Sequence, residues 1–207
     1  MKSVNLFIAL AICLIANTVH AQTIYMKFTQ YDNTVATAGL GKASTAKDGT
    51  NTVDLHDYIE VASAQFDEQQ TLNIGSTSSG ANTPNLVFNP FTITKPVDTF
   101  TANLFQYMAS GKPYKFVEIL FVKSGGSNVG SVFYKVLLKY VLVNTQAVSS
   151  VADCSDGCVV ESVSFAYAGM LQTTYKQQSD GFTPNSTTGW NRLRNQPDTD
   201  PTTPINP

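Results

Sequence analysis

This chain of 207 residues contains two histidines, His20 and His56, so few residues are available for histidine-based catalysis. A histidine can activate a nearby serine or cysteine as a nucleophile, and a pair of histidines is a common start for a zinc site. His20 falls in an apolar leader, so His56 stands alone in the rest of the chain, without a G-x-S-x-G signature. We therefore expect a structural or surface role for His56 beside Asp57, and no zinc site.

Closely spaced carboxylates are the other groups that could carry acid–base chemistry. Asp57 with Glu60 and Asp67 with Glu68 have suitable spacing, although such pairs commonly lie on a solvated strand face rather than across a bound substrate. Residues 153–157 resemble part of a calcium loop but lack its closing glutamate. The sequence therefore predicts no catalytic, cofactor-binding or metal-binding residues, and an enzyme such as a hydrolase is the weakest of the alternatives.

Two cysteines remain once the leader is set aside, Cys154 and Cys158. Their spacing permits a small disulfide-closed loop in an oxidising compartment. Such a short loop stabilises by about 2 kcal/mol, because it restricts the unfolded chain only a little. The alternative is a pair of free thiols in a turn, which is expected if the protein folds in the cytoplasm.

The first 21 residues have the pattern of a signal peptide. Lys2 supplies a positive start, residues 6–16 are an apolar run, and Val19-His20-Ala21 ends in the small residue that a signal peptidase prefers. A membrane anchor is the alternative, but a run of about eleven residues falls short of the roughly twenty that span a bilayer. We predict a signal peptide from Met1 to Ala21 and a secreted or periplasmic protein, without membrane insertion after cleavage.

Composition predicts one globular domain without a nucleic-acid partner. With 43% hydrophobic residues, the chain can bury one sizeable core. Its net charge is −2, and becomes −3 once the leader with Lys2 is removed. A phosphate-binding face needs clustered basic residues, and those of this chain are dispersed.

Between residues 98 and 111 the sequence predicts a helix. Asp98 can accept hydrogen bonds from the free amides of the first turn, and Gly111 can adopt the left-handed conformation that closes the last. An apolar face repeats with helical spacing at Phe100, Leu104, Tyr107 and Met108. We expect this face to be buried, with a sheet as its partner.

Long alternating strands follow the helix. Residues 116–123 and 132–143 predict two antiparallel strands joined through the glycine-rich residues 124–128. In the second strand the alternate residues from Val132 to Leu142 are apolar, while Lys135 and Lys139 share the other side. Residues 159–167 and 170–175 repeat the pattern around Gly169, as a second hairpin or as one bulged, bent strand.

Taken in order, these segments resemble the haemolysin-coregulated protein (Hcp) family, which forms the tube of bacterial type VI secretion. The segments that carry the likeness are residues 24–28, 56–61 and 91–95, the helix end at 110–112, the hairpin strands, and residues 161–167. The resemblance implies a mainly β domain over residues 22–182, an antiparallel β-barrel of two packed, curved sheets with one flanking α-helix at about residues 98–111. It also implies a homo-hexameric ring that can stack, binds effector or other secretion-system proteins, and has no catalytic residues.

An export signal is a departure from this family, whose members leave the cytoplasm through their own machine. The leading hypothesis is a structural and carrier protein, either a ring-forming tube subunit or a secreted relative. The alternative is an exported monomeric β-barrel module that recognises a surface glycan or an envelope protein.

Two polar segments and the chain end complete the picture. Residues 34–52 and 75–85 predict surface loops. The first matches a long family loop that reaches over a neighbouring subunit or the next ring, and an ordinary mobile loop is the alternative. Residues 183–207 predict a partly disordered tail. Trp190 resembles the closing segment of some family members and would then pack onto the barrel, or else lie exposed in a loose tail.

Overall fold

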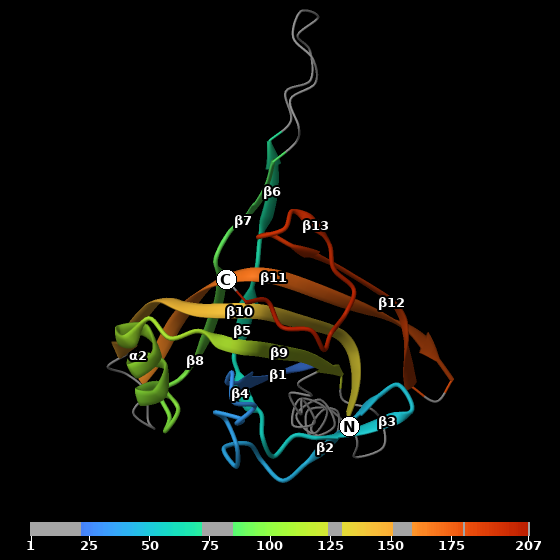
Figure 1. Ribbon diagram of the computed structural model, residues 1–207. Helices are drawn as coiled ribbons and strands as arrows, with labels where there is room; N and C mark the ends of the chain where they lie inside the picture. Colours follow the sequence, from blue (N-terminus) through green and yellow to red (C-terminus); the bar gives the residue numbers. More distant parts are fainter. Residues whose placement is uncertain (1–21, 72–84, 124–129, 151–158, 180, 207) are drawn as a thin grey trace, which may run out of the picture.

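The computed structural model describes residues 22–71, 85–123, 130–150, 159–179 and 181–206 (Figure 1). The strands are β1 (Gln22–Thr29), β2 (Thr45–Asp48), β3 (Asn51–Asp54), β4 (Ile59–Val61), β5 (Ser63–Gln65), β6 (Glu68–Thr71), β7 (Asn85–Phe88), β8 (Phe91–Pro96), β9 (Tyr114–Lys123), β10 (Gly130–Ser150), β11 (Val159–Gln178), β12 (Gly181–Asn191) and β13 (Gln196–Pro197), and the helix is α2 (Thr101–Ser110). No helix in these ranges is long and apolar enough to cross a bilayer. The predicted signal peptide lies outside the described residues.

The main sheet is ordered β13-β12-β11-β10-β9-β1-β4. Its centre is the predicted antiparallel pair, since β9 and β10 pair with Val117 opposite Leu138. β11 is one continuous strand through Gly169, so the single-strand alternative for residues 159–175 is correct. Its first half pairs with β8 and its second half with β12.

The sheet curls so far that its two ends nearly pair with each other, at the short strands β4 and β5. β4 pairs with β1, and β5 pairs with β8, with Ala62 between the two short strands. The amide of Ala62 donates to the carbonyl of Thr94 at 2.8 Å, but the ladder of backbone hydrogen bonds is interrupted there. The prediction of a mainly β, antiparallel barrel with one helix is confirmed, with an incompletely closed wall.

Aromatic side chains fill the interior, because every second residue of a strand points to one face. Phe28 lies at the centre of this core, with its ring centroid 5.0 Å from those of Phe100 and Tyr114 and 5.7 Å from that of Phe165. All four side chains are fully or almost fully buried. Their packing joins β1, β9, β11 and the residue before α2 in one core.

The apolar alternation of β10 changes phase at Tyr140, which the sequence did not predict. Val136 and Leu138 belong to the core, and so do Val141 and Val143. Tyr140 has a φ of 49°, a left-handed conformation rare for a bulky residue, and this turns the following residues over. Tyr140 and Leu142 are consequently only half-buried and are not core residues.

Helix α2 lies at one end of the barrel (Figure 1) and is shorter at its start than predicted. The predicted cap by Asp98 is wrong: its Oδ1 accepts at 2.9 Å from the N–H of Phe100, the residue before the helix, and no side chain of the described residues caps the first turn of α2. Gly111 closes the helix with a φ of 63°, as predicted. Leu104 is fully buried, and the ring of Tyr107 stacks on that of Tyr114 at 4.1 Å.

The end of the chain forms strands where we expected a loose tail. β12 runs across the expected domain boundary at residue 182 and pairs with β11, and Trp190 pairs with Met170 and packs against the core. A strand at a sheet edge gains its backbone hydrogen bonds whatever its side chains, so a polar composition was a poor guide. Trp190 therefore packs onto the barrel, as the family resemblance implied.

The first polar loop is also largely ordered. β2 and β3 form a hairpin around Gly49, whose φ is 63°, and β2 adds a short parallel pairing to β10. The second loop is flanked by β6 and β7, a separate two-stranded sheet that projects from the barrel (Figure 1). Most of that loop lies outside the described residues.

We predict that Leu104→Ala destabilises the protein by about 2–5 kcal/mol, because it leaves a cavity where the helix meets the core. Chemical denaturation measures this loss. The control is Gln106→Ala, an exposed position of the same helix, which should change stability by less than about 0.5 kcal/mol. Equal effects of the two substitutions would contradict the described packing of α2.

Candidate functional site

The groups singled out for acid–base chemistry lie apart on the surface. Nδ1 of His56 is 3.6 Å from Oδ1 of Asp57, and both side chains are about half exposed. Asp57 also accepts from the amide of Gly39 at 3.0 Å. Glu60 instead pairs with Lys42 at 3.3 Å, in full view of solvent. Asp57 and Glu60 thus have separate partners.

The second carboxylate pair lies at the root of the projecting β6–β7 sheet. Asp67 accepts from Nδ2 of Asn89 at 3.0 Å. Burial and the adjacent Asp67 charge raise the pKa of Glu68. Within the described ranges, no three histidine, cysteine, aspartate or glutamate side chains are grouped to hold a metal ion. Cys154 and Cys158 lie outside the described residues.

A buried ionic cluster joins α2 to the barrel; we call it the helix anchor (Lys95, Asp98, Thr101, Gln146 and Glu161). The ammonium of Lys95 lies 2.7 Å from Oε1 of Glu161 and 2.6 Å from Oδ1 of Asp98. Thr101 donates to Oε1 of Glu161 at 2.8 Å, and Gln146 donates to Oε2 at 2.6 Å. Neither the Lys95 nor the Glu161 side chain is exposed. The anchor therefore binds β8, β10, β11 and the start of α2 together.

Electrostatics keep Glu161 ionised in this buried place. Burial acts to raise its pKa, but hydrogen bonds from Lys95, Gln146 and Thr101, with the Lys95 charge, outweigh burial and lower the pKa below its ordinary value. A charge buried without such partners would cost several kcal/mol. The anchor is satisfied chemistry that holds structure, and it has no free reactive group.

The outer face, meaning the side of β1, β9, β10 and β11 that points away from the core, carries a second set of charges. Lys27 lies 3.1 Å from Glu118 on the neighbouring strand, and the Tyr58 hydroxyl donates to the same carboxylate. Burial, with the charge of Glu118, raises the pKa of Tyr58. These contacts seat the segment before β4 on the outer face.

Asp48 fastens the β2–β3 hairpin to the outer face in the same manner. It accepts from the ammonium of Lys135 at 2.7 Å and from the hydroxyl of Tyr175 at 2.5 Å. A small apolar cluster lies beneath the hairpin, formed by Ala46, Leu55, Tyr58, Leu120, Val122 and Val132. The hairpin is therefore packed against its own chain.

Residues 196–206, the C-terminal strap, cross the rest of the outer face. The buried ammonium of Lys139 lies 2.8 Å from Oδ2 of Asp198 and donates to the carbonyl of Asp200. Ile205 is buried over Gly169, where an added Cβ would lie 2.5 Å from its Cδ1. The Tyr31 hydroxyl donates to the carbonyl of Ile205 at 2.6 Å. The strap is thus held at its two ends.

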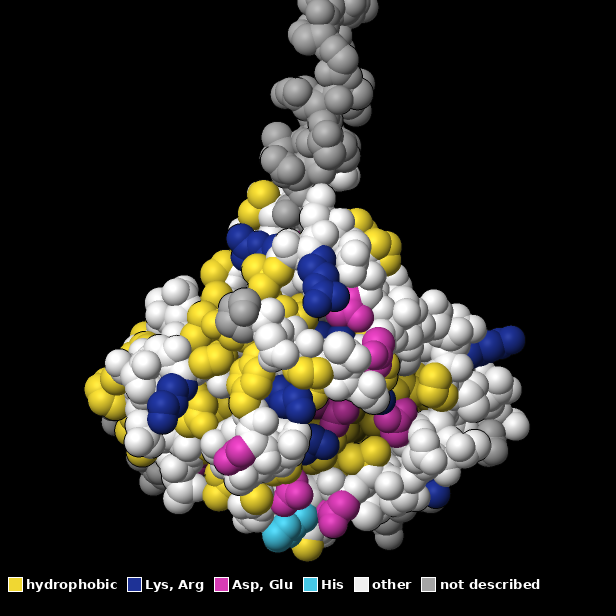
Figure 2. All heavy atoms as spheres, viewed as in Figure 1, with side chains coloured by type: hydrophobic (Ala, Val, Ile, Leu, Met, Phe, Trp, Pro, Cys, Tyr) yellow, Lys and Arg dark blue, Asp and Glu magenta, His cyan; other side chains and the backbone are white. Residues whose placement is uncertain are grey.

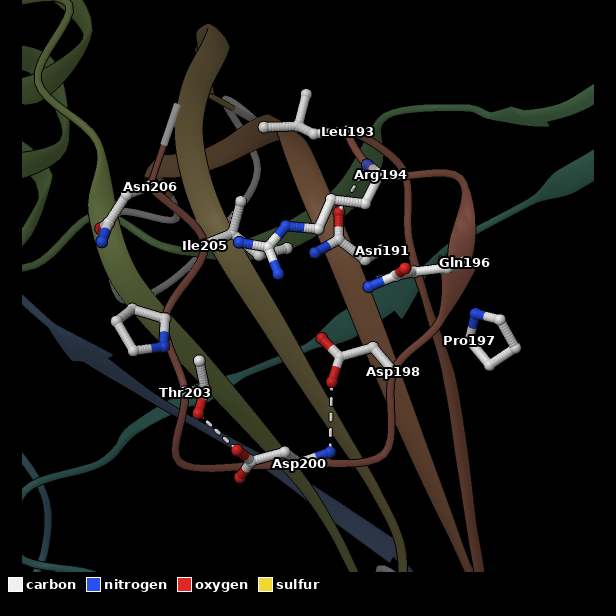
Figure 3. A pocket seen from close by; sticks show the side chains of 11 residues that line it. Asn191, Leu193, Arg194, Gln196, Pro197, Asp198, Asp200, Thr203, Ile205 and Asn206 are labelled. Carbon is white, nitrogen blue, oxygen red and sulfur yellow. Dashed lines mark hydrogen bonds between the residues drawn. The ribbon is translucent and has the colours of Figure 1, made fainter.

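Two hollows flank the strap. One, of about 220 Å³, lies between the strap and strands β9 to β12 and is lined by Glu118, Lys135 and Tyr175 among others. The other, of about 290 Å³, lies between the strap and the turn after β12, with the Arg194 side chain extending into it (Figure 3). Figure 2 shows basic and acidic side chains interspersed on the viewed face, which suits a protein partner better than a polyanion.

Sequence reasoning did not find the two buried lysines. Lys139 does lie on the side of β10 shared with Lys135, as predicted, but the strap covers it. Lys95 and Glu161 are opposite each other in the β8–β11 ladder. The available signal was an acid and a base at core-facing positions of two strands, with Asp98 three residues after Lys95.

A family model described as "Type VI secretion system effector, Hcp" matches residues 25–175. The chain belongs to the Hcp family. A structure described as a type six secretion system protein is 21% identical, covers 86% of this chain and 100% of its own, and gives a TM-score of 0.65. Hcp1 of Salmonella typhimurium is 18% identical with a TM-score of 0.59, covering 86% of this chain and 99% of its own.

Another similar structure is the secreted protein Hcp3 from Pseudomonas aeruginosa, 18% identical over 83% of this chain and 98% of its own, with a TM-score of 0.56. A search of curated proteins found no match. At these identities the solved structures establish the fold. The family match supports a type VI secretion tube or effector-carrier protein.

We predict that Glu161→Gln costs about 3 kcal/mol near neutral pH, because it leaves the buried Lys95 charge undercompensated. The lowered pKa of Glu161 means that its contribution is complete above the ordinary carboxylate value of 4.5 and is lost as pH falls through the folded value. Denaturant titrations of both proteins at a series of pH values should therefore converge in acid.

The matched control is Glu60→Gln, whose pair with Lys42 is exposed, and whose effect should stay below about 0.5 kcal/mol. A difference between the wild type and Glu161→Gln that is unchanged down to strongly acidic pH would show that the ion pair is not its source.

Proposed function

We propose that this Hcp-family protein is a structural and carrier subunit that closes into a homo-hexameric ring and binds effector or other secretion-system proteins. The observation that carries the proposal is the family match over residues 25–175 on a chain folded as the barrel with α2 at one end. Rings of this type can stack. A ring of copies needs no catalytic group, only two complementary patches on each subunit.

A closed ring forms when one patch binds a different patch on the next copy and the rotation returns to its start. The large apolar side chains most exposed in the described ranges are Phe105, Val148 and Leu193, with exposed fractions of 59, 58 and 56%. Phe105 is exposed on α2, whereas the neighbouring Leu104 is buried against the core. An exposed phenylalanine on a rigid helix is suited to the centre of a contact between copies.

We predict that the mature protein elutes as a hexamer, and that Phe105→Asp shifts it to smaller species by placing a charge in an apolar contact. Size-exclusion chromatography with light scattering measures the mass. Gln106→Asp, one residue further along the helix, is the control for added charge and should leave the hexamer intact. A wild type that is strictly monomeric at high concentration would defeat the ring and favour the monomeric module that recognises a surface glycan or an envelope protein.

Export through the general pathway is a further part of the proposal. It rests on the signal-peptide pattern of residues 1–21 and on the close spacing of Cys154 and Cys158, both outside the described residues. An exported Hcp-family protein would act outside the inner membrane, with its ring assembled there.

We predict that the protein isolated from its native compartment begins at Gln22 and that Cys154 and Cys158 resist alkylation until a reductant is added. Intact-mass measurement before and after alkylation tests both points. Protein that accumulates in the cytoplasm with Met1 and two reactive thiols would refute this export route and restore the ordinary tube role.

A further inference from the structure

The C-terminal strap is fastened by specific anchors but otherwise fits its own chain loosely. Between Asp198 and Ile205, the strap residues 199–203 are all exposed. Its bend depends on local hydrogen bonds, since Asp200 accepts from Thr202 and Thr203. The hollow of about 290 Å³ stays open beside it (Figure 3). The strap is thus held by two contacts, Asp198 on Lys139 and Ile205 over Gly169, while the residues between them bury little surface.

Three prolines restrict the backbone conformations of the strap. Pro197, Pro201 and Pro204 fix φ near the value of an extended polyproline conformation. This restriction lowers the conformational entropy that the strap loses when it binds a barrel, whether its own or that of a second copy.

The outer face would be destabilised around Lys139 if no segment covered it. Its side chain is 1% exposed, and its Nζ is held by Asp198 and the Asp200 carbonyl. An ammonium in such a place needs a carboxylate partner. The face must therefore be covered by a segment that carries an acid at one end and a branched apolar side chain, for the notch over Gly169, at the other.

We propose that the outer face of one copy binds the C-terminal strap of a second copy, so that straps are exchanged between neighbouring subunits. A second copy carries the same segment, with Asp198 and Ile205 at the same spacing, and so satisfies both anchors with the contacts seen within one chain. Exchange of an identical element is a low-cost route to association. The inference rests on the proposed assembly of copies and assigns it a specific contact.

Geometry limits which copies can exchange straps. Residues 198–206 can move while β13 keeps its pairing with β12. Nine residues of extended chain reach at most about 30 Å. Exchange is therefore confined to subunits in direct contact, such as neighbours in one ring or in stacked rings.

A charge-swap experiment on the full mature chain separates exchange from folding back. Lys139→Asp and Asp198→Lys each place like charges together, and each alone should lower Tm by roughly 5–10 °C. The two variants are then mixed, partly unfolded and refolded. If straps are exchanged, the outer face of each variant binds the strap of the other, and every pair between positions 139 and 198 joins opposite charges. We expect the mixture to recover Tm and an affinity tag on one variant to retain the other.

The double variant Lys139→Asp with Asp198→Lys, in a single chain, is the control for whether the reversed pair is tolerated. If the double variant recovers stability and the mixture neither recovers it nor co-purifies, straps are not exchanged and the inference is overturned. Gln196→Lys, an exposed position at the start of the strap, controls for the added charge alone and should leave Tm unchanged.

Cysteine cross-linking decides the question if the reversed pair is not tolerated. Chains carrying Gly169→Cys are mixed with chains carrying Ile205→Cys and oxidised, so a disulfide between positions 169 and 205 can form only between copies. Peptide mapping that finds this bridge supports exchange, and its absence overturns it. A hexamer without the bridge would refute strap exchange and leave the ring proposal intact. A bridged dimer without a hexamer would refute the ring and leave strap exchange intact.

Discussion

The ion pair between Lys95 and Glu161 is the contact on which the rest of the architecture depends. The two residues face each other across the β8–β11 ladder, the pairing that brings the curled sheet back toward its start. The same cluster reaches Asp98 and Thr101, so the entry into α2 is set by the charges that secure the wall. Loss of the pair would loosen the wall and the helix at one end of the barrel together.

The two faces of the sheet use different physics. The inner face packs aromatic rings around Phe28, whereas the outer face offers lysines and carboxylates to the segments that cross it. Apolar packing stabilises the barrel, whereas ion pairs determine which chain segments bind to its outer face. Because ion pairs depend on particular partners, the outer face is where an Hcp-family barrel can gain chain-specific contacts without altering its core.

Short-range patterns in the sequence predicted the helix, its glycine end and the central strand pair, because helix ends and strand periodicity are local signals. The mainly β barrel was an expectation from the family resemblance. The left-handed Tyr140 escaped prediction, since only tertiary packing makes that conformation tolerable. The polar chain end was misjudged because edge pairing draws on backbone groups. The buried Lys95 and Lys139 were missed because their partners lie about sixty residues away in the chain.

The interruption at Ala62 gives the barrel a mechanical seam. Elsewhere the wall strands are joined by long ladders with single bulges, but β4 pairs with β1 and β5 pairs with β8, which leaves few backbone hydrogen bonds across the junction. Regions with sparse hydrogen bonding open at the lowest free energy. When the wall is compressed or stretched, the junction at Ala62 should therefore open first. The diameter of the barrel can then change slightly while the aromatic core keeps its packing.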